Sequence, residues 1–235
     1  MATTSWPSRV MGMVAMIRAG LAALTIGLRH FWPFMPVTPL TPFAMQPFDQ
    51  LTLDTPRLHL RPLAAADAEA LFRIHADPQV MRYWSTPPWA GIEQAEAMIE
   101  ADREALPAGR HLRLALMLRG EPAGHSDSFV GTCSLFSFHE ASRRAEIGYV
   151  LARELWGRGL MHEALTALVG FAFGPLNLNR LEADIDPRNS ASAKSLARLG
   201  FVQEGFLRER WIVGDEVSDT ALFGLLSREW KAAVR

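Results

Sequence analysis

The stretch from Leu155 to Leu165, LWGRGLMHEAL, has the composition of an anion-binding turn. It follows an apolar, strand-like run and opens a run with helical spacing of apolar residues. Gly157 and Gly159 allow a tight turn and a close approach of a ligand to the main chain. The first N–H groups of a helix lack intrahelical partners and lie at the positive end of its dipole, and Arg158 adds a cation. This pattern favours phosphate binding, although a Gly-x-Gly turn before a helix is also common without a ligand.

Other kinds of chemistry lack the residues they need. His162-Glu163 begins like a zinc-binding helix, but Thr166 occupies the position of the second histidine. The third glycine of a dinucleotide-binding fingerprint is replaced by His162. Cys133, the one cysteine, lies in an apolar strand-like run, so a core position is favoured over a nucleophile. We therefore predict a site without metal and without a cysteine nucleophile.

The elements around this turn predict an α/β fold with a mixed sheet. Asp67 is expected to cap the first helix, which carries Leu71 and Ile74. Further helices are predicted over 92–106, 160–173 and 190–199, and strands over 57–61, 112–118, 129–138, 143–151, 180–186, 201–202 and 220–226. Leading helices, antiparallel hairpins and a final strand-helix alternation predict a mostly antiparallel sheet with helices on both faces.

Composition divides the chain into two parts. The 235 residues are 49% hydrophobic and 21% charged, which is typical of a packed protein, and the net charge of −1 argues against a nucleic-acid partner. We expect residues 1–50 to be an extension outside the fold and residues 51–231 to form one domain. The apolar stretch 10–28 contains Arg18, so a membrane helix and an export signal are alternatives that we do not favour. The single cysteine suits a reducing, cytoplasmic location.

Five motifs in order resemble the GNAT superfamily of N-acetyltransferases, in its RimJ/RimL-like branch of ribosomal-protein N-terminal acetyltransferases. They are Leu53-x-Thr55-x-Arg57-Leu58-x-Leu60-Arg61-Pro62, Glu146-Ile147-Gly148-Tyr149, Trp156-Gly157-Arg158-Gly159-x-x-x-Glu163-Ala164, Asn189-x-x-Ser192 and Leu199-Gly200-Phe201-x-x-Glu204-Gly205. The resemblance covers the whole predicted domain and excludes residues 1–50. It implies a GNAT fold and acetyl transfer from acetyl-CoA, a co-substrate, to a primary amine.

The resemblance also implies a coenzyme site. The main-chain N–H groups of Gly157, Arg158, Gly159, Leu160 and Met161 are expected to bind the pyrophosphate, with Met161 bulkier than the family pattern prefers. The main chain of Tyr149, Val150 and Leu151 is expected to hold the pantetheine arm. Asn189 is expected to contact the pantetheine or to serve only as a helix cap.

Two residues are expected to act in the chemistry. Glu146 is the candidate general base, because apolar surroundings can raise the pKa of a carboxyl toward working pH; a solvated strand carboxylate is the alternative. Many relatives carry a tyrosine acid at the position of Leu196, which here has no hydroxyl. The resemblance implies that Ser192 takes that role and hydrogen-bonds the leaving thiolate. Glu204 is a further carboxylate near the expected amine.

The resulting functional prediction is an N-acetyltransferase that acts on a protein N-terminus or on a small amine. A non-catalytic acyl-CoA-binding domain on the same fold is one alternative. A membrane-tethered adaptor that uses residues 10–28 is another. Tyr83, Trp84 and Trp89 are expected either to wall the acceptor groove or to pack in the core.

Overall fold

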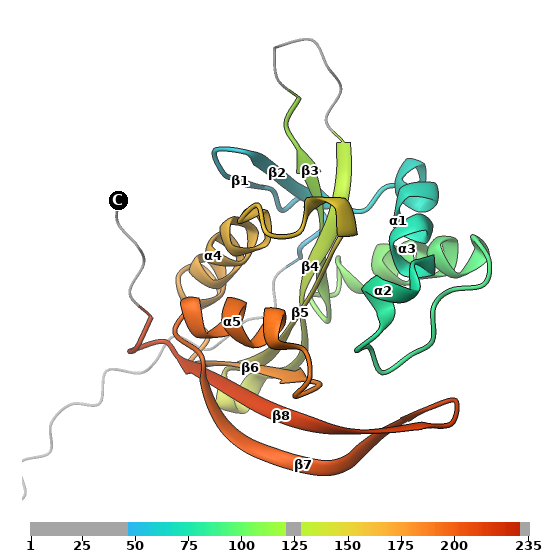
Figure 1. The fold of residues 1–235 in the computed structure, drawn as a ribbon. Coiled ribbons are helices and arrows are strands. Elements are labelled where there is room, and N and C mark those ends of the chain that lie inside the picture. The colour runs from blue at the N-terminus through green and yellow to red at the C-terminus, as the bar shows by residue number, and fades with distance from the viewer. Residues whose placement is uncertain (1–46, 121–127, 231–235) are drawn as a thin grey trace, which may run out of the picture. The chain divides into compact units, whose positions relative to one another are not determined.

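One mixed sheet runs through the part of the chain that the computed structural model describes, residues 47–120 and 128–230 (Figure 1). Its strands are β1 Leu53–Asp54, β2 Leu58–Pro62, β3 Leu112–Leu118, β4 Ser128–His139, β5 Arg144–Leu151, β6 Arg180–Ile185, β7 Val202–Val213 and β8 Glu216–Leu226. Their order in the sheet is β1-β2-β3-β4-β5-β6-β8-β7. The β5–β6 pair is parallel and the other six described pairs are antiparallel, so the predicted mostly antiparallel mixed sheet is confirmed.

Helices cover both faces of the sheet, as predicted. They are α1 Ala68–Ala76, α2 Pro78–Met81, α3 Glu93–Ala105, α4 Leu160–Phe173 and α5 Ser190–Arg198. In Figure 1, α1, α2 and α3 lie on one side of the central strands, and α4 and α5 lie on the other. The helix and strand periodicities in the sequence therefore located most elements to within one or two residues.

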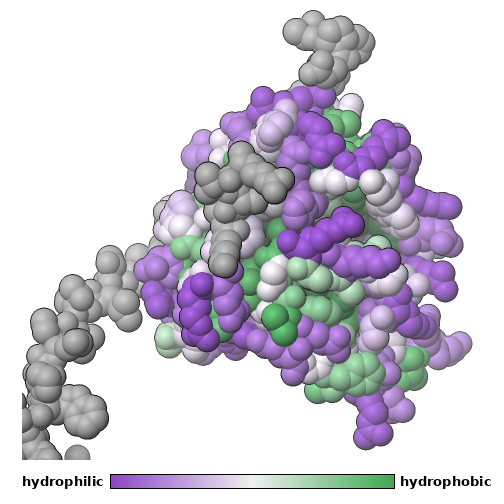
Figure 2. Space-filling model, turned by 60° about the vertical axis from the view of Figure 1, so that its left-hand side comes forward, coloured by the Kyte–Doolittle hydropathy of each residue, from purple (hydrophilic) through white to green (hydrophobic). Residues whose placement is uncertain are grey.

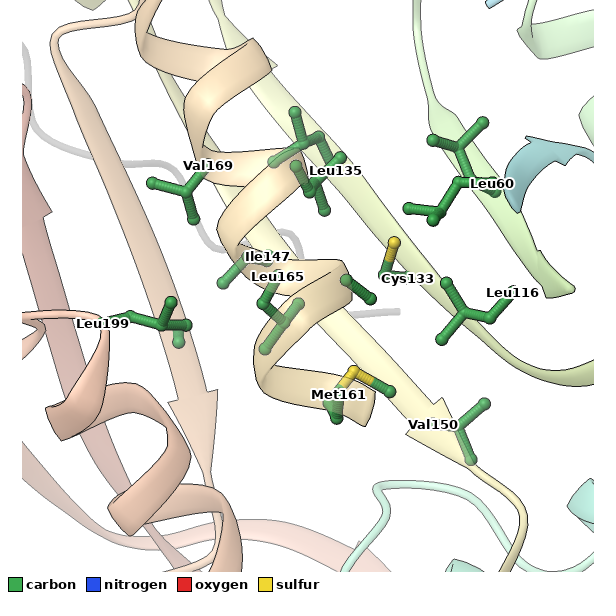
Figure 3. Packing of buried hydrophobic residues seen from close by; sticks show 14 of the residues in the cluster. Leu60, Leu116, Cys133, Leu135, Ile147, Val150, Met161, Leu165, Val169 and Leu199 are labelled. Atoms are coloured by element: carbon green, nitrogen blue, oxygen red, sulfur yellow. The ribbon is translucent and has the colours of Figure 1, made fainter. Parts of the chain in front are cut away.

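The core forms where α4 packs on the middle of the sheet. Met161, Leu165 and Val169 on α4 belong to the same buried cluster as Leu135 on β4 and Ile147 on β5 (Figure 3). Alternation along β3 buries Leu112, Leu114 and Leu116 completely, since every second side chain points to the same face. Cys133 is also fully buried, and burial raises the pKa of its thiol to about 12, so the predicted core position of this residue is confirmed.

Two local expectations differ from the structure. Asp67 precedes α1, but its side chain does not cap that helix. Instead its carboxylate accepts two hydrogen bonds from Arg61, each 2.8 Å long, and one from the main-chain N–H of Ala64. The Asp67 carboxylate thus pairs with the Arg61 guanidinium instead of capping α1. The packed unit also begins before Leu51, because Phe48 is 1% exposed and its N–H donates to the carbonyl of Leu106.

The last two strands form a far longer hairpin than the sequence indicated. We predicted strand only at 201–202 and 220–226, whereas β7 and β8 have 12 and 11 residues. Most of β7 is exposed on both faces, so it shows neither a buried run nor strict alternation. Large apolar side chains such as Phe206 and Ile212 are exposed on it, at 50% and 71%. The face seen in Figure 2 is otherwise covered mainly by hydrophilic side chains, with apolar ones in smaller groups.

No helix of the described residues combines the length and apolarity that a membrane crossing requires. The stretch 10–28 and most of the predicted extension 1–50 lie outside those residues.

Candidate active site

The parallel strands β5 and β6 pair only at their beginning. Their register runs from Arg144↔Arg180 to Glu146↔Glu182, and no described strand pairs with that edge of β5 beyond Glu146. The main-chain groups of successive strand residues point to opposite edges. Because the N–H of Ala152 donates to Val130 on β4, Val150 also faces β4, whereas Tyr149 and Leu151 face the open edge. Of the three residues predicted to hold a ligand by their main chain, two are therefore placed to do so.

The open edge leads directly to the N-terminus of α4. The carbonyl of Leu151 accepts a hydrogen bond of 2.8 Å from the indole N–H of Trp156, which holds the connecting turn against the strand. Gly157 and Gly159 both have left-handed backbones, with φ of 74° and 76°, a conformation that favours glycine. No side chain caps the helix at Gly159, so its first N–H groups have no side-chain acceptor there.

The side chains of the first helical turn leave this surface open. Leu160 and Met161 are 3% and 9% exposed and belong to the core cluster, and Figure 3 shows Met161 pointing into that cluster. The bulk of Met161, which the family pattern disfavours, therefore lies away from the exposed amides. Arg158 is exposed beside them. The backbone and charge of 157–161 consequently have the features that anion binding at a helix N-terminus requires, and the pyrophosphate site stays a prediction.

Glu163 ties this turn to the segment between β1 and β2. Its carboxylate accepts hydrogen bonds from the Thr55 hydroxyl at 2.6 Å, the Arg57 N–H at 2.8 Å and Arg57 Nε at 2.7 Å. Arg57 also donates from Nη1 to the carbonyl of Arg158 at 3.0 Å. Burial would raise the pKa of Glu163, but the hydrogen bonds from Thr55 and Arg57 outweigh it and lower the pKa. The Arg158 carbonyl is thereby held toward Arg57.

Two hydroxyl groups lie in contact beside the open edge of β5. Tyr149 Oη and Ser192 Oγ are 2.6 Å apart, which joins β5 to the first turn of α5. Burial raises the pKa of Tyr149 to about 12, against the opposing effect of this hydrogen bond. Asn189 caps α5 by accepting from the N–H of Ser192 at 3.0 Å. Leu196, where relatives carry a tyrosine, is fully buried in the core.

Glu146 is partly exposed and projects from β5 to the face opposite Tyr149, because the two are three residues apart in a strand. In the described residues no hydrogen bond to its carboxylate is formed. Its neighbour across the sheet, Glu182, is paired with Arg144 at 2.6 Å and Arg180 at 2.8 Å. Glu204 is also paired with Arg180, and hydrogen bonding to that guanidinium lowers the pKa of Glu204. Glu146 is thus the carboxylate of this group that is left unpaired.

The aromatic residues before α3 divide between two environments. Trp84 and Trp89 pack around His75, with ring centroids 5.6 and 4.2 Å from its ring, and burial lowers the pKa of His75 to about 4. Tyr83 instead lies under the guanidinium groups of Arg82 and Arg188. The two tryptophans therefore pack against the core, which was one of the two expectations for them. Tyr83 instead lies beside Arg188, in the connection between β6 and α5.

A hollow of about 530 Å³ lies between α3 and the beginning of β3. It is lined by Trp89, Met98, Asp102, His111, Arg113 and four residues of small or polar type on α3. Trp89, a candidate for the acceptor groove wall, lines it, but none of the residues predicted for catalysis or coenzyme binding does. We therefore place the candidate site at the open edge of β5 and the N-terminus of α4 rather than at this hollow.

The structure brings together residues that the sequence showed only as separate motifs. Pairing of β5 with β6 ends at Glu146, the Ser192 hydroxyl contacts Tyr149 on the edge of β5 that follows, and Trp156 holds the turn at 157–161 against Leu151. Sequence reasoning missed the hydroxyl of Tyr149 and the contact between Arg57 and Glu163. Thr55, Arg57 and Glu163 were all motif residues, but no pattern could show that positions 106 apart in the chain touch.

Comparisons with known proteins agree with this geometry. The family model described as "Acetyltransferase (GNAT) domain" matches residues 57–202. The uncharacterized N-acetyltransferase p20 of Bacillus licheniformis is 36% identical over 179 residues, which cover 76% of this chain and 98% of that protein. The [ribosomal protein uS5]-alanine N-acetyltransferase of Escherichia coli is 33% identical over 84 residues, which cover 36% of this chain and 43% of that enzyme.

Among solved structures, Mycobacterium smegmatis RimJ in complex with CoA-disulfide matches with a TM-score of 0.69 and 27% identity, covering 79% of this chain and 91% of that one. The predicted fold, co-substrate and reaction class are thereby confirmed, and the enzyme prediction holds over the non-catalytic alternative. The chain belongs to the GNAT family of acetyltransferases and is an acetyl-CoA-dependent N-acetyltransferase.

Proposed function

We propose that this N-acetyltransferase acetylates the α-amine of a polypeptide N-terminus at the opening between β5 and β6. One observation carries the assignment of the reacting centre. Glu146 projects from one face of β5 at the last residue paired with β6, and the paired hydroxyls of Tyr149 and Ser192 lie on the other face. A thioester lying along this edge therefore has a carboxylate on the side of an incoming amine and hydroxyl groups on the side of the leaving sulfur.

The coenzyme lies along the strand and ends on the helix. The main-chain groups of Tyr149 and Leu151 that face the opening hydrogen-bond the pantetheine amides, and Val150 contributes packing because its own main chain faces β4. The pyrophosphate lies on the N–H groups of Gly157 to Met161, with Arg158 neutralising its charge. Asn189 positions Ser192 by capping α5 rather than by reaching the ligand, since its Oδ1 accepts from Ser192.

Two side chains take part in acetyl transfer. Glu146 accepts a proton from the ammonium group of the acceptor, directly or through water, because its carboxylate has no competing partner among the described residues. The free amine then attacks the thioester carbon, and the C–S bond breaks with its electron pair on sulfur. Ser192 stabilises that sulfur by hydrogen bonding.

Two observations bear on the acceptor. The relative named for alanine acetylation of a ribosomal protein supports a protein N-terminus. The carboxylate of Glu146, which has no partner among the described residues, would attract any ammonium group, which supports a small amine as the second candidate.

An acceptor screen tests the proposal. Consumption of acetyl-CoA is followed with peptides whose side-chain amines are blocked, with the same peptides acetylated at the N-terminus, and with small amines. We expect turnover with the free N-terminal peptides and none with their acetylated controls. Turnover confined to small amines would reverse the choice of acceptor.

A further inference from the structure

The Tyr149 hydroxyl has two acceptors within reach, both on Ser192. Its oxygen is 2.6 Å from Ser192 Oγ and 3.4 Å from the main-chain oxygen of the same residue. A phenol carries one proton, so it can donate fully to only one of them. The shorter distance is typical of a good O–H···O hydrogen bond, whereas the longer one is weak. Either hydroxyl can be the donor at 2.6 Å, and a phenol is the more acidic of the two, so donation from Tyr149 to Ser192 Oγ is the favoured direction.

The direction of this hydrogen bond decides what Ser192 can do. If Ser192 donated to Tyr149, its single proton would be used and its oxygen could offer a ligand only lone pairs. If Tyr149 donates, the proton of Ser192 is free to point to a third atom. The Ser192 backbone is fixed meanwhile, because Asn189 accepts from its N–H at 3.0 Å. The Ser192 hydroxyl can then still rotate about its C–O bond, and this rotation sets the direction of its proton.

We propose that Tyr149 is a positioning residue that donates to Ser192 Oγ and thereby directs the Ser192 proton toward the sulfur of acetyl-CoA. The proposal rests on the role given to Ser192 under the proposed function. Hydrogen bonds in a chain polarise one another, so donation by Tyr149 also makes Ser192 a stronger donor. Burial keeps the Tyr149 hydroxyl protonated across the neutral range, since its pKa is raised to about 12.

The pair acts by hydrogen bonding and loses no proton. The amine nitrogen forms its bond to the acetyl carbon while the C–S bond breaks and leaves its electron pair on sulfur. The nitrogen gives up two protons: Glu146 passes the first, taken from the ammonium group, to solvent before the attack, and the second, released as the amide forms, goes to Glu146 or to water. Ser192 donates a hydrogen bond to the sulfur, and the thiolate takes its proton from solvent after release. Tyr149 and Ser192 therefore end the cycle in the states in which they began.

The test compares Tyr149→Phe, Ser192→Ala and the double variant in single-turnover acetyl transfer, so that product release does not hide the chemical step. We expect Tyr149→Phe to slow transfer about tenfold, the loss of roughly one hydrogen bond, with the KM for acetyl-CoA and the Tm close to those of the wild type. In the Ser192→Ala background the same change should cost less than twofold. Ser195→Ala is the matched control, because it removes another hydroxyl of α5, one that donates to the carbonyl of Ala191.

The double-variant comparison separates positioning from packing. A wild-type rate in Tyr149→Phe overturns the inference, as does an equal loss with and without the Ser192 hydroxyl. A wild-type rate in Ser192→Ala overturns the proposed role of Ser192 and this inference together. If the acceptor screen finds no substrate, the proposed function fails by itself. The variants are then compared in hydrolysis of acetyl-CoA, in which the same C–S bond breaks; equal hydrolysis by Tyr149→Phe and wild type would overturn the inference.

Discussion

The two ends of the proposed coenzyme site are built from different kinds of interaction. At the pyrophosphate end, a charged pair between Arg57 and Glu163 holds a glycine turn, and the Arg57 side chain is 47% exposed. At the sulfur end, two neutral hydroxyls of Tyr149 and Ser192 meet between a strand and a helix, where Ser192 is 9% exposed. The charged side chains at the proposed pyrophosphate end, which would attract a phosphate, lie close to solvent. The hydroxyl groups of Tyr149 and Ser192, which would act on the sulfur atom, are more buried and are held in position by their hydrogen bond.

This difference separates binding from chemistry along one ligand. Changes at the pyrophosphate end should alter the affinity for acetyl-CoA and leave the chemical step close to normal. Changes at the sulfur end should do the reverse, because few ground-state contacts depend on them. A variant at one end that changed both the affinity for acetyl-CoA and the rate of the chemical step would contradict this separation.

The largest effect is expected from Glu146→Gln, which keeps the shape of the side chain but removes the base. We expect kcat at pH 7 to fall by about 10²–10⁴, the usual contribution of general base catalysis, with CoA affinity near the wild-type value. Steady-state kinetics and calorimetry measure the two quantities. Glu140→Gln, on the exposed turn after β4, is the control. An unchanged kcat would remove Glu146 from the mechanism.

The next effect belongs to the other end of the ligand. Gly159→Asp places a side chain at φ 76° and a negative charge beside the pyrophosphate, so CoA affinity should fall about 100-fold. Gly214→Asp is the matched control, because Gly214 also has a positive φ, 59°, but lies in the β7–β8 turn. Equal CoA binding by wild type and Gly159→Asp, measured by calorimetry, would place the pyrophosphate elsewhere.

A smaller effect is expected from loosening the glycine turn indirectly. Glu163→Gln removes the charge that holds Arg57, so the KM for acetyl-CoA should rise roughly three- to tenfold while kcat changes less than twofold. Arg103→Ala, which breaks an exposed pair with Glu100 on α3, should change neither. A fall in kcat alone would contradict the division between the two ends.

The same pair predicts a pH dependence of stability. The hydrogen bonds from Thr55 and Arg57 outweigh burial and lower the pKa of Glu163 in the folded state below its ordinary value of 4.5. Such a carboxylate stabilises the fold above its unfolded pKa and loses that contribution as the pH falls through the folded pKa. The Tm difference between wild type and Glu163→Gln should therefore be constant from pH 6 to 8 and shrink below about pH 4.5. A difference that grows in acid would contradict this assignment.

The smallest effect sharpens the comparison without mutation. Salt screens exposed charges more than partly buried neutral groups, since the Debye length falls to a few ångströms near 1 M. Raising NaCl from about 0.05 to about 0.5 M should raise the KM for acetyl-CoA several-fold and change the single-turnover rate less than twofold. A comparable salt effect on both would mean that the sulfur end also depends on exposed charge.

Sequence periodicity predicted the bounds of secondary structure best in elements whose buried side chains recur at a regular spacing. It predicted β3 as Leu112–Leu118 and α4 as Leu160–Phe173, because one face of each is apolar at a fixed spacing. It failed for β7, whose side chains are exposed along most of the strand and show no such spacing. It also assigned Asp67 to a cap, because the competing Arg61 lies on a different element and no local rule includes it.

The sequence by itself determined the reaction class, through the resemblance of its motifs to the GNAT family, and it determined the glycine turn before α4 and the position of Glu146 on a strand, since these depend on residue types in local order. Only the tertiary structure decided how far β5 stays paired with β6, and hence which main-chain groups face a ligand. It also decided that Tyr149 meets Ser192 and that Arg57 meets Glu163. Contacts between distant segments depend on how the elements pack in three dimensions, and a local pattern holds no record of that packing.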